Sequence, residues 1–301
     1  MTIVTGNKPD YFLVGLGEIL WDLLPGGKRL GGAPANFAYQ AQSLGGIAAV
    51  VSCVGNDDLG HEVLRRLDDL GLDRRYVAVD RDHPTGTVTV RLNADGHPDY
   101  TIQEEVAWDY MPFSSGLQAL ADRTDAVCYG SLCQREAVSR QTIRQFLAAT
   151  NPACLRIFDI NLRQAYYGRE SIHVLLKLSN VFKLNDEELP VVAQLLRIGG
   201  SETDILAQLV ERYALRLIAL TKARDGSRLY GFGEDLAHRG YPADIADTVG
   251  AGDSFTAALT LGLLRGHSLD RINEHANRVA SFVCAQPGAM PGLPAALAQT
   301  G

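Results

Sequence analysis

The sequence lacks several features that would point to a common class of protein. Its 301 residues carry a formal net charge of −7 and contain no run rich in lysine and arginine, so the clustered cations that a non-specific nucleic-acid surface needs are missing. No apolar run approaches the roughly 18 residues that a membrane helix requires, and the N-terminal MTIVTGNKPD has no apolar core like that of a signal peptide. We predict a soluble, cytoplasmic protein with neither nucleic acid nor a membrane as partner.

Paired cysteines are lacking as well. The five cysteines are odd in number, form no C-x-x-C pair and lie in mostly apolar surroundings (Cys53, Cys128, Cys133, Cys154 and Cys284). We therefore expect buried free thiols in a reducing cytosol.

The usual nucleotide-binding motifs are also missing. No G-x-x-x-x-G-K-[ST] stretch occurs, and GLGEIL at 15–20 lacks the third glycine of a dinucleotide fingerprint. These absences weigh against an ordinary P-loop or Rossmann protein.

What the sequence does contain is a regular alternation of short apolar runs and longer segments with helical periodicity. The hydrophobic content of 46% is enough for a large core. This alternation predicts an α/β fold with a mostly parallel central sheet and helices on both faces, in which ligands bind beyond the carboxyl ends of the strands. The expected strands are 11–20, 48–55, 125–131, 155–162, 181–185 and 216–223, and the expected helices include 36–45, 59–71, 139–150, 188–198 and 202–215.

Two stretches break this alternation. Residues 85–102 alternate with period two on either side of Asn93-Ala94-Asp95-Gly96, which is typical of a β-hairpin, and 21–32 is a second short strand pair that turns at Pro25-Gly26-Gly27. We expect these strands, drawn from about 20–34 and 84–104, to form a small β-sheet lid over the site. No linker or repeat marks a second domain, so 1–301 is predicted to be one domain.

The stretch DTVGAGDSF at 247–255 carries the clearest chemical signal. Its two glycines allow the amides of 250–253 to converge at the N-terminus of a helix, where unpaired N–H groups and the helix dipole favour an anion. A carboxylate at Asp253 would be repelled by that anion unless it has a task, such as accepting a proton from a nucleophile that attacks the anion. The alternative is that Asp253 only caps the helix.

Two further stretches suit a polyhydroxylated ligand. In GGAPANFA (31–38), adjacent glycines allow close approach to a ligand and Asn36 offers both a donor and an acceptor, although Asn36 could equally be a polar residue at a helix start. Asp22 follows an apolar strand at the mouth of the expected site, where it is either a ligand for hydroxyl groups or a surface turn residue.

Three strand ends complete the set of candidates. DINLR places Asp159, Asn161 and Arg163 on one face if the strand continues, and Arg163 could pair with a phosphate or a carboxylate. In KLNDEE, Asn185 and Glu188 either order water around Mg²⁺ or cap a helix. The stretch TKARDG could frame a nucleotide between Thr221 and Gly226.

Together these motifs resemble the ribokinase-like, PfkB-type family of sugar and nucleoside kinases over essentially the whole chain. DTVGAGDSF resembles the C-terminal signature of that family, and GGAPANFA with GNDDLG (55–60) resembles the N-terminal one. The features that resemble the fructokinase branch are GEILWDLLP (17–25), PTG (84–86), AWD (107–109) and GSLCQR (130–135) followed by DINLR.

The resemblance implies a role for each matching residue. Asp253 would be the catalytic base, and the amides of Gly250, Ala251 and Gly252 would hold the transferring phosphate. The remaining matches are Asp22, Gly32 and Asn36 for the sugar, Arg163 near the phosphate or the sugar, Asn185 and Glu188 for Mg²⁺ and phosphates, and Thr221 and Gly226 for the nucleotide, where Ala223 replaces a usual glycine.

The resemblance further implies a K⁺ site at Asp247, Val249 and Gly288, and a homodimer that forms through the lid. The implied reaction uses ATP and Mg²⁺ to phosphorylate a primary hydroxyl group, O6 of D-fructose first among the candidates. The alternatives are a kinase for 2-keto-3-deoxygluconate, ribose or a riboside, and a catalytically silent sugar- or nucleotide-binding regulator.

Overall fold

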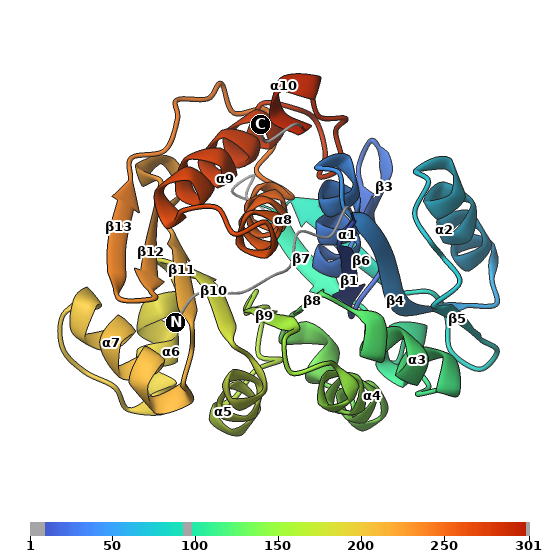
Figure 1. The fold of residues 1–301 in the computed structure, drawn as a ribbon. Helices are drawn as coiled ribbons and strands as arrows, with labels where there is room; N and C mark the ends of the chain where they lie inside the picture. Colours follow the sequence, from blue (N-terminus) through green and yellow to red (C-terminus); the bar gives the residue numbers. More distant parts are fainter. Residues whose placement is uncertain (1–9, 93–97, 299–301) are drawn as a thin grey trace.

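A computed structural model describes residues 10–92 and 98–298. Its central feature is a nine-stranded sheet in the order β13-β12-β11-β10-β9-β8-β1-β4-β5, which is parallel except for the antiparallel edge strands β12 and β13 (Figure 1). These strands are β1 (Phe12–Leu16), β4 (Ile47–Gly55), β5 (Val77–Asp80), β8 (Ala126–Tyr129), β9 (Leu155–Asp159), β10 (Val181–Asn185), β11 (Leu217–Thr221), β12 (Ser227–Gly231) and β13 (Glu234–His238).

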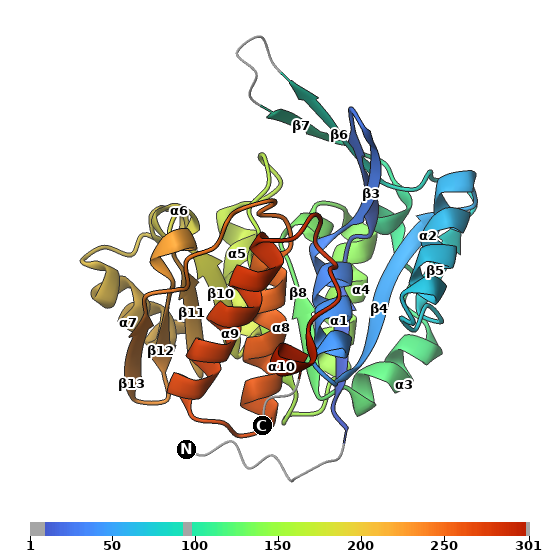
Figure 2. The ribbon, with the colours of Figure 1, turned by 90° about the horizontal axis from the view of Figure 1, so that it is seen from above.

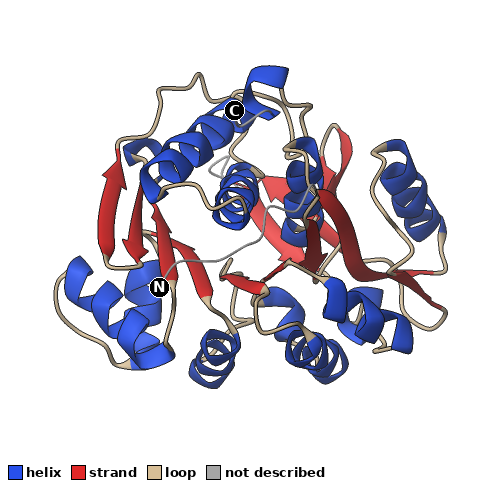
Figure 3. Ribbon diagram, in the orientation of Figure 1, coloured by secondary structure: helices blue, strands red, loops and turns tan. Residues whose placement is uncertain are grey.

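Helices cover both faces of this sheet, as the near-continuous apolar strands require (Figures 1 and 3). One apolar cluster lies between the sheet and α1 (Ala33–Ser43), α2 (Asp58–Asp69), α8 (Ala251–Leu264) and α9 (Leu269–Cys284). A second lies between the opposite face and α3 (Ser115–Arg123), α4 (Ala137–Ala149), α5 (Arg169–Leu178), α6 (Glu188–Leu196) and α7 (Glu202–Tyr213). The short helix α10 (Ala295–Ala298) follows α9, and the expected three-layer arrangement is confirmed.

A separate small sheet is formed by the two stretches that break the alternation. Its order is β3-β2-β6-β7, and it projects from the body at the end where β1 leads into β2 (Figure 2). The strands are β2 (Leu20–Leu24), β3 (Gly27–Gly31), β6 (Thr87–Leu92) and β7 (Pro98–Ile102). The turn expected at Asn93–Gly96 lies outside the described residues.

The small sheet is tied to the loop that follows β9. The side-chain amide of Gln164 donates to the carbonyl oxygen of Tyr100 on β7, at 2.8 Å, and the Tyr166 hydroxyl donates to Glu104 at 2.6 Å. The loop with Arg163 therefore lies under the small sheet.

A buried ion pair joins AWD and GSLCQR, two of the motifs that resemble those of the fructokinase branch. Arg135, in GSLCQR, donates from Nε and a terminal nitrogen to both carboxylate oxygens of Asp109, in AWD, at 2.8 and 2.6 Å. The Asp109 side chain is fully buried, and the guanidinium lies 4.1 Å from the ring centroid of Trp108. The same guanidinium donates to the carbonyl oxygen of Gln103, so the pair anchors the end of the small sheet to the body.

Some local expectations were wrong. The strand at DINLR does not continue to Arg163: β9 ends at Asp159, and Asn161 has a left-handed backbone with φ 42°, so the alternation of side chains stops there. All five cysteines carry free thiols, but Cys284, near the end of α9, is only half-buried. In the chain from 10 to 298, apart from 93–97, no helix is long and apolar enough to cross a bilayer.

We predict that Asp109→Ala lowers the free energy of unfolding by about 3–5 kcal/mol, because it leaves the Arg135 guanidinium buried without its counter-ion. Urea titration measures the change. Asp68→Ala removes the partner of Arg74 in an exposed pair and serves as the control, with an expected loss below about 1 kcal/mol. Equal losses in the two variants would contradict the anchoring role of Asp109.

Candidate active site

The segment DTVGAGDSF forms the turn that leads into α8. Gly250 precedes the helix with φ 80°, and a Cβ atom there would collide with Ala289, so only glycine fits. The amides of Gly252 and Asp253 belong to the first helical turn, which provides no backbone acceptor for them. The Ala251 amide makes one long hydrogen bond, 3.4 Å, to the carbonyl oxygen of Thr248. This turn, residues 250–253, is called the anion loop below.

Asp253 is almost completely buried at the mouth of α8, with 8% of its surface exposed. Its carboxylate accepts a hydrogen bond of 2.8 Å from the side-chain amide of Asn36, whose own oxygen has no hydrogen-bond partner among the described residues. Burial raises the pKa of Asp253 to about 6; the charge of Asp159 acts in the same direction, while Asn36, Lys183 and Arg163 oppose it. The carboxylate is thus a base that is ionised at neutral pH.

Beneath the anion loop lies an ion pair that the sequence reasoning missed. Lys183 on β10 and Asp159 on β9 are 3.0 Å apart and nearly inaccessible, with 5% and 4% of their side chains exposed. The only sequence signal for Lys183 is a lysine inside the apolar run VFKLN. Thr256, on the first turns of α8, donates a hydrogen bond of 2.9 Å to the second oxygen of Asp159.

Glu18 is a second residue that the sequence reasoning passed over, although it stands in GLGEIL two residues after the end of β1. It is 5% exposed, and its Oε2 atom lacks a hydrogen-bond partner within the described part of the chain. Burial raises its pKa to about 7; Arg163 lowers that pKa and Asp253 raises it. A buried acceptor of this kind, near Asp253, suits a hydroxyl group of a ligand.

The other residues expected to bind sugar lie around Glu18 and Asp253. Gly32, with φ 109°, starts α1, and a Cβ atom there would overlap the carbonyl oxygen of Glu18, so the glycine lets α1 approach the end of β1. Asp22 lies on β2 of the small sheet, and burial raises its pKa to about 6. Arg163 is exposed on the loop after β9, and its positive charge lowers the pKa of Glu18, Asp22 and Asp253.

Asn185 and Glu188 form the reciprocal capping arrangement. The Asn185 side-chain oxygen accepts from the Glu188 amide at 2.8 Å, and one Glu188 oxygen accepts from the Asn185 amide at 2.9 Å. The other Glu188 oxygen accepts from the Leu162 amide, also at 2.9 Å. Each oxygen of this buried carboxylate keeps a lone pair for a further donor, such as a water molecule on a metal ion.

Asp247, Val249 and Gly288 are brought together, but the Asp247 carboxylate is already engaged. It accepts hydrogen bonds from the amides of Val249 and Gly288 at 3.0 and 3.1 Å. It also accepts a hydrogen bond of 2.7 Å from the guanidinium of Arg29 on β3, which the sequence did not predict. The small sheet is thereby connected to the segment before the anion loop.

Thr221 and Gly226 flank a tight turn between β11 and β12. Gly226 has φ 85°, and a Cβ atom there would collide with the backbone of 238–240, which explains this glycine by packing. Ala223, which replaces the usual glycine, is exposed and adopts φ 45°.

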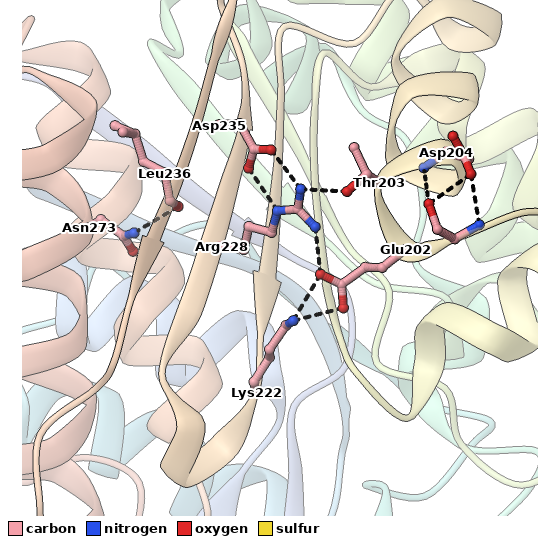
Figure 4. Close-up of polar contacts among 9 residues, drawn as sticks. Glu202, Thr203, Asp204, Lys222, Arg228, Asp235, Leu236 and Asn273 are labelled. Atoms are coloured by element: carbon pink, nitrogen blue, oxygen red, sulfur yellow. Dashed lines mark hydrogen bonds and ion pairs between the residues drawn. The ribbon is translucent and has the colours of Figure 1, made fainter.

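An ion-pair network holds this edge of the sheet (Figure 4). Glu202, at the start of α7, accepts hydrogen bonds from Lys222 and Arg228, and Arg228 also bonds Asp235 on β13. The network fixes the strands on either side of the turn that contains Ala223.

The arrangement can hold an anion at the helix N-terminus and place a base beside it. A small cavity lies next to Asp253; its other lining residues are Ala33, Pro34, Cys128, Tyr129, Gly130, Asp159 and Asn161. A base placed next to a bound anion is what phosphoryl transfer to a hydroxyl group requires.

Comparisons with known proteins place the chain among carbohydrate kinases. A family model described as pfkB family carbohydrate kinase matches residues 26–296. A fructokinase of Escherichia coli is 30% identical over 93% of this chain and 95% of its own. An uncharacterised sugar kinase of Pyrococcus horikoshii is 30% identical over 87% of this chain and 83% of its own; its structure in complex with ATP matches with a TM-score of 0.75, over 93% of this chain and 94% of that chain.

The fold is shared more widely. A fructokinase of Vibrio cholerae, solved with fructose, ADP and calcium ion bound, matches with a TM-score of 0.79 at 23% identity, over 96% of this chain and 98% of that chain. The expected ribokinase-like fold is therefore confirmed.

We predict that Asp253→Asn raises the free energy of unfolding by about 1–3 kcal/mol above pH 6, because it removes a buried charge while its amide oxygen can still accept from Asn36. The folded-state pKa, about 6, lies above the reference value of 3.8. The gain should therefore shrink as the pH falls below 6 and disappear below 3.8, where Asp253 is neutral in both states. Urea titrations at several pH values measure it, with exposed Asp69→Asn as control; a gain that does not depend on pH would contradict the prediction.

Proposed function

Because the chain belongs to the pfkB family of carbohydrate kinases, we propose that it transfers the γ-phosphoryl group of ATP to a primary hydroxyl group, O6 of D-fructose, to form fructose 6-phosphate and ADP. The observation that carries this proposal is the Asp253 carboxylate, which is ionised at neutral pH and held by Asn36 at the last residue of the anion loop. The similarity to the fructokinase of Escherichia coli supports fructose as the acceptor.

In this reaction Asp253 accepts the proton of the attacking hydroxyl group. The amides of Gly250, Ala251 and Gly252, with the dipole of α8, hold the transferring phosphoryl group. The hydroxyl oxygen forms a bond to the γ-phosphorus, its proton passes to Asp253, and the bond between the γ-phosphorus and the ADP oxygen breaks. Asn36 and Asp22 bind sugar hydroxyl groups, with Gly32 allowing close approach, and the Arg163 guanidinium offsets the negative charge of the site.

The nucleotide and its metal ion are proposed to bind along the carboxyl ends of β10 and β11. Glu188, with Asn185, fits a water-mediated Mg²⁺ site because each Glu188 oxygen accepts only one backbone hydrogen bond. Bound Mg²⁺ would neutralise charge on the phosphates. Thr221 and Gly226 border the nucleotide in this proposal.

The Asp247 carboxylate fits the role of a K⁺ ligand less well than Glu188 fits that of a Mg²⁺ ligand. It already accepts three hydrogen bonds, one of them from the Arg29 guanidinium, which supplies the positive charge that a bound cation would bring. Stimulation by K⁺ therefore stays a prediction from the resemblance, and no step of the proposed reaction depends on it.

The small sheet is proposed to act as a lid over the sugar. Asp22 and Arg29 occupy opposite positions on β2 and β3, and Arg29 bonds Asp247 in the segment before the anion loop. A lid in this place would exclude water, which competes with the sugar as phosphoryl acceptor.

A coupled assay of ADP release tests the function with D-fructose, 2-keto-3-deoxygluconate, ribose and a riboside, each with ATP and Mg²⁺. We expect the highest kcat/KM with fructose. A higher value with another substrate would reassign the acceptor within the family, because a few pocket side chains decide it. The absence of ADP release with every acceptor, together with measurable sugar or nucleotide binding, would indicate a catalytically silent binding protein.

We predict that Asp253→Ala lowers kcat by about 10²–10⁴-fold with the fold intact, the range usual for loss of a general base. In the wild-type protein, kcat/KM should fall as the pH drops through about 6, where Asp253 becomes protonated. Steady-state kinetics and circular dichroism measure both effects, and Asp69→Ala on the exposed end of α2 serves as control. Near-normal turnover by a folded Asp253→Ala variant would refute the assignment of the base.

We predict that Asn36→Ala raises KM for the sugar while KM for ATP changes little, because the lost hydrogen bonds lie on the sugar side. The variant also removes the donor to Asp253, so the acidic limb of the pH profile should move to higher pH. Equal weakening of both substrates, with an unmoved pH profile, would show that Asn36 is only structural.

A further inference from the structure

The ion pair of Lys183 and Asp159 lies directly behind the anion loop. The two residues face each other in register on the parallel strands β10 and β9, and the ammonium and carboxylate groups are 3.0 Å apart. A Cβ atom on Gly252 would lie 2.9 Å from Nζ of Lys183, so the ammonium group rests against the backbone of the loop. Lys183 is the one lysine that is buried in the described part of the chain.

Asp159 contacts the same helix from the other side. The hydroxyl group of Thr256 donates to Asp159 and lies 2.9 Å from the carbonyl oxygen of Gly252. The pair thus contacts the first two turns of α8 at two points, through the Lys183 ammonium group against Gly252 and through the Thr256 hydroxyl group.

Stability alone gives little reason for such a pair. Removing two charges from water costs several kcal/mol for each ion, and an apolar pair of similar volume is often as stable. Here the Lys183 ammonium group also rests against the turn that is suited to bind an anion, and its charge lowers the pKa of the buried Asp253 carboxylate.

We propose that Lys183 and Asp159 are positioning residues that fix the charge balance behind the anion loop, with Lys183 keeping Asp253 negatively charged. This inference rests on the proposed function only where it concerns turnover. The electrostatic effect on Asp253 exists in the free protein and can be measured there.

Several elements place charged or titratable groups around Asp253. Asp159 raises its pKa, whereas Lys183, Arg163 and the Asn36 amide lower it. Two further groups that interact with Asp253 are Glu18 after β1 and the Cys128 thiol on β8. Lys183 and Asp159 are the members of this set that neutralise each other through direct contact.

The two charges predict opposite changes. Lys183→Met removes a positive charge and leaves Asp159 without its counter-ion, so the pKa of Asp253 should rise by about one pH unit or more. Asp159→Asn removes a negative charge and leaves Lys183 uncompensated, so the pKa of Asp253 should fall by a similar amount. The double variant Lys183→Met/Asp159→Asn carries neither charge and should titrate between the two single variants.

Carbon-13 NMR of protein labelled in the aspartate carboxyl groups tests this directly, without substrate. The Asp253 signal is identified by its loss in Asp253→Asn and is followed against pH in the wild-type protein and the three variants. Shifts of opposite sign in the single variants would support the proposal. Unmoved titrations, or shifts of the same sign, would overturn it, even if the variants melt at lower temperature.

A second comparison covers the case in which Lys183→Met does not fold. Asp159→Asn and the double variant then differ only in the side chain at position 183, which is lysine in the first and methionine in the second. The pKa of Asp253 should be higher in the double variant. If the two variants titrate alike, Lys183 has no electrostatic role. Lys183→Arg, which keeps the charge, should retain the wild-type titration wherever the larger group is accommodated, as judged by an unchanged melting temperature.

The pH profile of kcat/KM links the result to turnover. The acidic limb should move in the same directions as the NMR titrations. If the protein phosphorylates none of the sugars tested, the proposed function fails, while the opposite NMR shifts still establish the role of the ion pair.

Discussion

The burial of the Asp253 carboxylate is the constraint on which the arrangement of the site depends. Placing a negative charge at the mouth of a buried helix is costly, and the helix N-terminus, the Asn36 amide and the Lys183 ammonium each offset part of that cost. The compensation is incomplete, so the pKa stays near 6 rather than near its usual value. A base in that range is both charged at neutral pH and able to accept a proton.

The parallel sheet brings the groups that offset the charge of Asp253 to one edge of the fold. Glu18, Asp159 and Asn185 come from distant parts of the sequence, yet each stands at or just beyond the carboxyl end of a strand of the same sheet. The amino ends of α1 and α8 point to the same edge. The fold therefore concentrates carboxylates, amide donors and helix dipoles at one place, and the ion pair beneath the anion loop limits the resulting repulsion.

Much of the fold could be predicted from the sequence because apolar periodicity marks each buried face. The run at 181–185 was predicted with its observed bounds, and the expected helix at 202–215 appears as α7, two residues shorter. The antiparallel strands β12 and β13 were not foreseen, since SRLYG and EDLAH mix polar and apolar residues as solvent-facing loops also do. In DINLR, polar and apolar residues alternate as far as Arg163, but the left-handed backbone of Asn161 ends the extended conformation that this alternation predicts.

The site was predictable where glycine and charge stand together, as in the anion loop, and much less so where one polar residue lies inside an apolar run. The sequence around Lys183 and Glu18 shows only a charged residue next to apolar ones. It does not show their function, because their partners come from other strands and loops.

The contacts between the loop after β9 and the small sheet couple the position of Arg163 to the position of that sheet. Gln164 and Tyr166 bond Tyr100 and Glu104, so the segment that carries Arg163 is attached to β7 and its continuation and not only to the body. A displacement of the small sheet would drag this segment with it. The Arg163 guanidinium, which lowers the pKa of Glu18, Asp22 and Asp253, would then move together with the proposed lid, so that admission of a ligand would be coupled to the electrostatic balance of the interior.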